Sequence, residues 1–115
     1  MSLFWTMTIK NAASRAVFRA EKMGKTDLLA GEQLFAGLNC FEPGQEHALH
    51  AHPGQDKLYV VLEGQGEATV GEQIERVAAG DVVLARDGVS HAMSNPGPAR
   101  LVVMTVMAPP PRKRT

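Results

Sequence analysis

The segment 44-GQEHALHAHPGQDK-57 contains three histidines, and two of them, His50 and His52, have one residue between them. In an extended strand, residues two apart point to the same face, so both imidazole rings are expected on one side of the strand. A histidine that could join this pair, His91, follows about 40 residues later, in the segment 80-GDVVLARDGVSHAMSN-95. Histidine is the commonest metal ligand in proteins, and a site with three of them keeps a coordination position for water or substrate. The three residues therefore predict a reactive or sensing metal site, because a closed structural zinc site would need a fourth fixed ligand.

The rest of the chain is typical of an all-β protein. Short runs rich in valine, leucine and aromatic residues alternate with turn-forming glycines and prolines. Strands are expected at residues 33–41, 57–63, 67–70, 81–85 and 100–107. Their spacing of about ten residues fits a sandwich or a small barrel. A parallel α/β sheet would need helices between the strands, and one short helix is predicted, over 14–23 with Ser14 as its N-cap.

Composition narrows the classes of function. The chain has 115 residues, enough for one domain, with 12 basic and 12 acidic residues. No basic stripe with interleaved aromatics is visible, so nucleic acid is not an expected partner. No apolar run is long enough to span a bilayer, and the start of the chain lacks the basic region of a signal peptide. The single cysteine, Cys40, fits a reducing cytoplasm, and we predict that it is a core residue.

The two histidine segments also match a pair of spaced motifs. From Gly44 the chain follows the pattern G-x5-H-x-H-x4-E, except that Lys57 stands in place of the glutamate. From Gly80 it follows G-x5-P-x-G-x2-H-x3-N, except that Arg86 stands in place of the proline. These are the two signature motifs of the cupin superfamily, and the chain resembles a small single-domain cupin over residues 31–107. The resemblance implies an antiparallel double-stranded β-helix (a jelly-roll barrel), a metal ion near its centre, and frequent dimers.

Three parts of the chain are expected on this basis. Residues 1–30 form an N-terminal extension that is partly ordered, and residues 31–107 form the cupin barrel. Residues 108–115, which read APPPRKRT, are expected to be a disordered, proline-rich basic tail. The segment 101–107 is apolar on both faces, which indicates a strand covered on both sides. Either a homodimer interface or a neighbouring sheet would cover it.

By resemblance, His50, His52 and His91 bind a divalent metal, which could be Fe, Mn, Ni or Zn, and Lys57 occupies the position of the fourth ligand. An ammonium group cannot bind a metal and repels one nearby. Three arrangements remain open. The metal is held by three histidines with Lys57 turned aside, or a strand bulge brings in the carboxylate of Asp56. Alternatively, no metal binds tightly, and Lys57 with the histidines receives an anionic ligand.

Strand alternation assigns the neighbouring side chains. Tyr59 shares the face of Lys57, so both are predicted to face the barrel interior, where they could contact a substrate. His47 lies an odd number of positions before His50, so we expect it on the opposite face, as a surface residue. Glu46 falls on the His50 face, where it could hydrogen-bond a ligand histidine.

Two hypotheses for function follow. The first is a small metalloenzyme of the oxygenase or isomerase type, in which the metal polarises an oxygenated substrate. The second is a non-catalytic module that binds or senses a small molecule, with weak metal binding or none. The fold does not decide between them. A DNA-binding regulator is disfavoured because the chain has no room for a helix-turn-helix domain.

Overall fold

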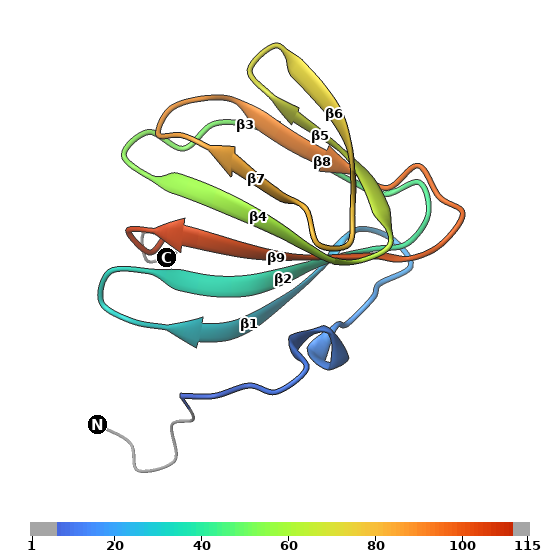
Figure 1. Cartoon of the computed structure of the whole chain (residues 1–115), viewed down its shortest axis with the longest axis horizontal. Helices are drawn as coiled ribbons and strands as arrows, with labels where there is room; N and C mark the ends of the chain where they lie inside the picture. The colour runs from blue at the N-terminus through green and yellow to red at the C-terminus, as the bar shows by residue number, and fades with distance from the viewer. Residues whose placement is uncertain (1–6, 112–115) are drawn as a thin grey trace.

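The computed structural model describes residues 7–111, and within them the protein is an all-β sandwich that closes into a barrel (Figure 1). Five strands form one sheet in the order β1-β2-β9-β4-β7, and four form the other in the order β3-β8-β5-β6. Every strand pair is antiparallel. The strands are β1 (Gly24–Ala30), β2 (Phe35–Phe41), β3 (Glu46–His50), β4 (Asp56–Glu63), β5 (Gln65–Val70), β6 (Gln73–Ala78), β7 (Val82–Ala85), β8 (His91–Ser94) and β9 (Leu101–Ala108). The predicted jelly-roll architecture is confirmed.

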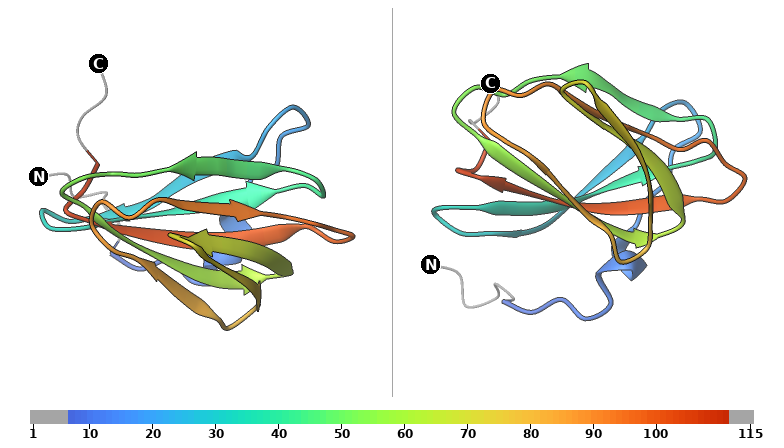
Figure 2. Two further views of the ribbon diagram at one scale, coloured as in Figure 1. Left: turned by 90° about the horizontal axis from the view of Figure 1, so that it is seen from above. Right: turned by 45° about the horizontal axis from the view of Figure 1, so that its top comes forward.

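The barrel interior is built from side chains that alternate along the strands. On β4, every second residue from Lys57 to Val61 is buried between the sheets, and the residues between them face outward and are half-buried. The two sheets face each other (Figure 2), and the buried positions of β4 lie between them. The interior cluster consists of Met23, Phe41, Tyr59, Val61, Ala68, Val77, Met93, Leu101 and Val103. Because this apolar cluster occupies one part of the barrel, the polar side chains described below gather in the other.

The N-terminal segment covers part of the outer face of the five-stranded sheet. Phe18 and two alanines pack there on a second buried cluster of Leu38, Cys40 and Val102. The predicted helix over 14–23 is wrong, because only a 3-10 turn, Ala12–Arg15, is helical. Asn11 precedes that turn in a left-handed conformation and makes no side-chain cap, and from Ala16 the backbone is extended. Packing on the sheet thus overrides the weak local preference for a helix.

The strands change two of the segment boundaries that were expected from the sequence. β1 lies within the segment 1–30 and is an edge strand of the sheet, paired with β2. β9 continues to Ala108, and residues 109–111 follow it. The disorder predicted for the tail falls, for residues 112–115, outside the described residues. Over 7–111, no helix has the length and apolar character that crossing a membrane requires.

The turns at the ends of the two motifs depend on particular residues. Gly44 and Gly80, which start the two motifs, have φ angles of +89° and +98°, which side chains other than glycine rarely adopt. Asn95, which ends the second motif, is buried and donates hydrogen bonds from Nδ2 to the carbonyls of Phe41 and Ala99. Its Oδ1 accepts a third hydrogen bond from the N–H of Gly97. The motif residues therefore fix the loop after β8 against the end of β2.

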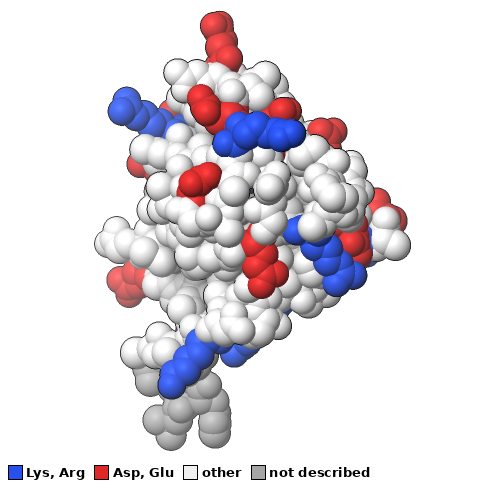
Figure 3. Space-filling view, turned by 45° about the vertical axis from the view of Figure 1, so that its right-hand side comes forward, with Lys and Arg blue, Asp and Glu red and all other residues white. Residues whose placement is uncertain are grey.

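Charged groups of both signs are spread over the surface. On the face shown in Figure 3, lysine and arginine side chains alternate with aspartate and glutamate side chains. The charges that concern a ligand are instead inside the barrel.

Candidate metal centre

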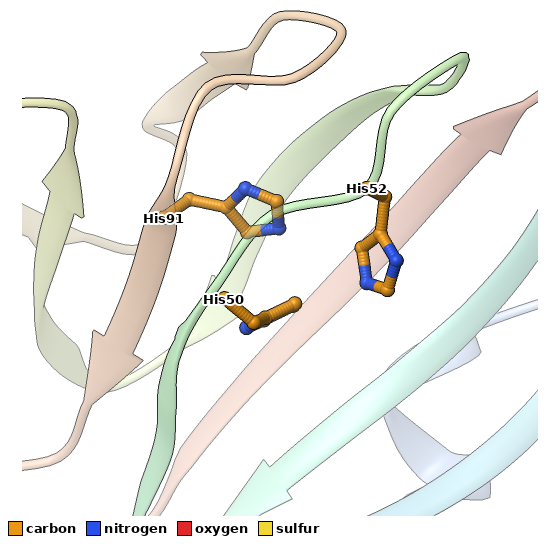
Figure 4. Close-up of side chains that lie close together, drawn as sticks. All are labelled: His50, His52 and His91. Atoms are coloured by element: carbon orange, nitrogen blue, oxygen red, sulfur yellow. The ribbon is translucent and has the colours of Figure 1, made fainter.

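The three predicted ligands meet at one end of the barrel. His50 ends β3, His52 follows in the next loop, and His91 begins β8, where it pairs directly with His50. One ring nitrogen from each histidine lies within 4.8 Å of the other two. Figure 4 shows the three side chains pointing toward one another. Imidazole nitrogens bind zinc at about 2.0–2.1 Å, so the three rings would have to move slightly closer together to share one ion.

Hydrogen bonds already orient two of these rings for metal binding. Nδ1 of His50 lies 2.6 Å from the carbonyl oxygen of Ala48, and Nδ1 of His91 lies 2.9 Å from that of Val89. Since a carbonyl only accepts, each Nδ1 carries the proton and each Nε2 keeps its lone pair. Both Nε2 atoms are buried and have no hydrogen-bond partner in the described part of the protein. A metal ion would satisfy both, so the donor set fits a divalent ion.

The surroundings keep the three rings neutral. Burial lowers the pKa of His50, His52 and His91, and the positive charge of Lys57 lowers it further. The carbonyl hydrogen bonds of His50 and His91 raise the pKa of those two rings but do not reverse the shift. A neutral imidazole is the form that binds a metal, so the rings are ready to act as ligands near pH 7.

Lys57 lies inside the barrel, as the motif position predicts. It is only 3% exposed, and its Nζ lies 4.9 Å from the centre of the Tyr59 ring. Among the described residues no carboxylate forms an ion pair with it. Burial, and then the charge of Lys25, lowers the pKa of Lys57 to about 8. A buried ammonium without a counter-ion is unfavourable, and an anionic ligand would relieve it.

Asp56 does not reach the histidines. The pairing of β4 with β9 is regular from Asp56 to Val61, so the bulge that would turn Asp56 inward is absent there. Its side chain is exposed, and Oδ1 accepts a hydrogen bond of 2.8 Å from the backbone N–H of Asp87. The expectation that Asp56 supplies a fourth ligand therefore finds no support in this geometry, because Lys57 holds the inward position.

His47 faces the site, and its predicted surface position is wrong. A bulge in β3 pairs His47 with Met93 and His50 with His91, so three residues of β3 span two of β8. The rings of His47 and His50 are 4.2 Å apart, and Nδ1 of His47 is buried without a partner. Burial, followed by the charge of Lys57, lowers the pKa of His47 to about 3. The same bulge turns Glu46 outward, so its predicted place beside a ligand histidine is also wrong.

Tyr59 lies in the core behind the site. It is fully buried, its ring centre is 6.0 Å from that of His91, and its hydroxyl has no hydrogen-bond partner among the described residues. Burial raises the pKa of the phenol, which therefore stays protonated. The predicted contact of Tyr59 with a substrate stays a prediction, since the ring supports Lys57 and does not line the cavity.

A cavity of about 920 Å³ opens beside the histidines. Its lining includes His47, His50, His52 and Lys57, together with side chains of β1, β2 and β9 and the prolines that follow β9. Sequence reasoning missed Lys25, Phe35 and Pro109–Pro111 as parts of this wall. Period-two alternation could have placed Phe35 on an inner face. The prolines gave no signal, because their position depends on where β9 ends.

Comparison with known proteins agrees with this architecture. The family model described as "Cupin domain" matches residues 37–107. A crystal structure of TT1209 from Thermus thermophilus is 33% identical, with a TM-score of 0.87 over 91% of this chain and 100% of that chain. A double-stranded β-helix protein from Klebsiella pneumoniae is 25% identical, with a TM-score of 0.81 over 88% of this chain and 89% of that chain.

Two similar proteins, both from Thermotoga maritima, have names that refer to oxalate. A protein named "Oxalate-binding protein" is 32% identical over 75 residues, which cover 65% of this chain and 61% of that protein. A structure described as a predicted oxalate decarboxylase is 25% identical, with a TM-score of 0.71 over 75% of this chain and 79% of that chain. The chain thus spans less than two thirds of the curated relative's length. With a family match over more than half of its residues, the chain belongs to the cupin-domain family.

Proposed function

We propose that the protein binds a divalent metal ion through His50, His52 and His91, and binds a small carboxylate between that ion and Lys57. One observation carries the proposal. Two histidine nitrogens with free lone pairs and a buried lysine without a counter-ion are gathered at the same end of the barrel, where His50 and Lys57 line one cavity. The first group attracts a cation and the second an anion, so a metal and a carboxylate together satisfy both.

The protein's own groups have distinct parts in this proposal. His50 and His91 are fixed by backbone carbonyls, while His52, which is exposed, completes the triad from the loop after β3. Fe, Mn, Ni and Zn all suit three imidazoles. When bound, the metal supplies Lewis acidity and a coordination position for an oxygen ligand. Lys57 neutralises the carboxylate, and the Tyr59 ring holds the lysine from behind.

Oxalate is the first ligand to test. It has two carboxylates, so one molecule can contact both the metal and Lys57. The name of the Thermotoga maritima relative supports this choice. Catalysis is the second candidate, because a site with three histidine ligands leaves a coordination position for a substrate oxygen.

Calorimetry with metal-loaded protein tests the proposal. The protein is incubated with Zn²⁺ or Mn²⁺, desalted, analysed for metal and titrated with oxalate. We expect one ion per chain, with oxalate binding at least tenfold more weakly to Lys57→Met and unchanged in a control variant, Lys22→Met, whose lysine is exposed. No retained metal, or equal oxalate binding by the wild type and Lys57→Met, would contradict it. Release of formate or carbon dioxide during the same titration would add catalysis to binding.

We also propose that two copies of the chain associate through the outer face of the five-stranded sheet. Val82 and Leu84 on β7 are 63% and 50% exposed, and their neighbours Leu58 and Val60 on β4 are only half-buried. An aliphatic patch of this kind is typical of an interaction surface. Sedimentation equilibrium should give a dimer that Leu84→Glu converts to a monomer, and a monomeric wild type would contradict the proposal.

A further inference from the structure

The cavity is far larger than the ligand named in the comparisons. Its volume is about 920 Å³. Oxalate fills about as much space as three water molecules, roughly 90 Å³. Cavities of about 300–1,000 Å³ are typical of sites for ligands with rings and side chains. A bound oxalate would leave most of this space to water.

An apolar strip leads away from Lys57 along the cavity wall. Lys57 on β4 pairs with Met107 on β9, which in turn pairs with Phe35 on β2. The three residues form one cross-strand row, and all of them line the cavity. Beyond the ammonium, a ligand lying along this row therefore meets first a thioether and then a phenyl ring. These are surfaces that bind aromatic and aliphatic groups.

The proline segment Pro109–Pro111 forms another apolar part of the wall. It continues from the end of β9 and lines the same cavity. Nε2 of Gln55 donates a hydrogen bond of 2.9 Å to the carbonyl of Pro109, which ties the segment to the loop that carries His52. Proline has a restricted backbone and no N–H, so this wall is stiff and offers carbon surface with carbonyl acceptors only.

The remaining part of the wall does not favour a second anionic group. Lys25 and Asp27 lie two residues apart on β1, and both line the cavity. Both side chains are exposed, so solvent screens their opposite charges. Asn39 and Thr105, which line the cavity as well, are neutral. The buried charge of the wall is that of Lys57, at one end of the apolar strip.

We infer that the ligand is a carboxylate with an apolar body of the size of an aromatic ring. Its anionic head lies between the histidine site and Lys57. Its body packs on Met107 and Phe35, beside Pro109–Pro111. The inference rests on the proposed function for the head and extends it to the rest of the molecule.

A matched pair of ligands isolates the apolar body. Malonate and benzylmalonate have the same dicarboxylate head and differ by a benzyl group. Both are titrated into the Zn²⁺-loaded full chain by calorimetry, with oxalate as a third ligand. Burying roughly 60 Å² of the ring at about 25 cal/mol per Å² gives about tenfold tighter binding of benzylmalonate. The ratio of the two dissociation constants cancels any effect on the head.

Variants and a spectroscopic probe locate the body. In Phe35→Ala the ratio should fall to about threefold or less, because half of the apolar contact is lost. Ending the chain after Ala108 keeps all nine described strands and should also lower the ratio. Ile74→Ala, which removes an apolar side chain that is 62% exposed on the other sheet, should leave the ratio unchanged. In protein labelled at the methionine methyl groups, benzylmalonate should shift the Met107 signal through the ring current of its phenyl group, and malonate should not.

The outcomes separate the two proposals. If oxalate and malonate bind while benzylmalonate binds no better or is excluded, the inference is overturned and the proposed function stands. If none of the three ligands binds to the metal-loaded protein, both are overturned. Tighter binding of benzylmalonate that survives Phe35→Ala and the truncation, without a shift at Met107, also overturns the inference, because the body then lies elsewhere.

Discussion

Replacing Lys57 by methionine should tighten metal binding and weaken carboxylate binding. Methionine keeps most of the length and the apolar stem of lysine, so packing on the Tyr59 ring is largely retained. What it removes is a buried positive charge that acts on all of the clustered histidines, since Lys57 lowers the pKa of His47, His50, His52 and His91. A charge this close to the ligands opposes a divalent ion.

The pKa of Lys57 limits the size of the effect. When the repulsion from the metal is strong, the ammonium releases its proton, and the free-energy penalty cannot exceed that of deprotonation. With a pKa of about 8, this penalty at pH 7 is about 1.4 kcal/mol, or tenfold in metal affinity. Below pH 8, the protonated fraction approaches one, so the upper limit on the penalty grows by about 1.4 kcal/mol, or tenfold in affinity, for each pH unit. Above pH 9, Lys57 is neutral and the two proteins should bind the metal equally.

Competition with a chromophoric chelator measures this directly. Zn²⁺ affinity is determined for the wild type and Lys57→Met at pH 6, 7, 8 and 9 without carboxylates, with Lys22→Met as the control. The wild type should bind Zn²⁺ more weakly than Lys57→Met by up to about tenfold at pH 7, and the two affinities should be nearly equal at pH 9. Protonation of the histidines affects both proteins and largely cancels in the ratio. A variant that binds Zn²⁺ no better than the wild type at pH 6 and 7 would refute the reasoning, because Lys57 would then not act on the ion.

Three further predictions concern individual side chains. His47→Ala should keep Zn²⁺ affinity within about threefold of the wild type, because His47 lies beside the triad and not in it. His91→Ala should lower Zn²⁺ affinity about 100-fold. An equal loss in both variants would make His47 a ligand. Asn95→Ala should lower the free energy of unfolding by about 3 kcal/mol in urea titration, since it removes three hydrogen bonds of a buried side chain, and a change below about 1 kcal/mol would contradict this. Cys40 should react with a thiol reagent only after unfolding, because the residue is 0% exposed and burial raises the pKa of its thiol. Rapid labelling of the native protein would contradict this, since the cluster of Leu38, Cys40 and Val102 would then have to open.

The motifs predicted the fold and the centre of the site because their spacing reflects strand geometry. His50, His52 and His91 converge as expected, and period-two alternation correctly placed Lys57 and Tyr59 inside the barrel. The structure also explains why the second motif ends in Asn95, because the side chain of this residue closes the turn after β8.

The errors arise where local geometry departs from regular alternation. One extra residue in β3 reverses the faces of His47 and Glu46, and no residue in the segment 46–50 predicts a bulge. At Asp56 the strand is regular, so its side chain keeps the outward position that alternation gives it. The segment 14–23 has a helix-like sequence, but a short helix is only marginally stable in water. From Ala16 the backbone is extended, and Phe18 packs on the outer face of the sheet.

The walls of the cavity could not be predicted from the sequence for a different reason. Its walls come from both ends of the chain, with Lys25 on β1 and the prolines after β9, and from Phe35 on the strand between them in the sheet. Contacts between residues so distant in sequence depend on the order of the strands, which the motifs do not contain.

A crystal structure of the Zn²⁺-incubated protein, with anomalous differences measured on both sides of the zinc absorption edge, tests the central claim most directly. We predict one strong anomalous peak at the point shared by the three histidine nitrogens, within about 2.0–2.3 Å of each, with the Lys57 ammonium directed away from it. The absence of a peak at that point from a fully incubated crystal, or a peak held by other residues, would contradict the assignment of His50, His52 and His91 as the metal site.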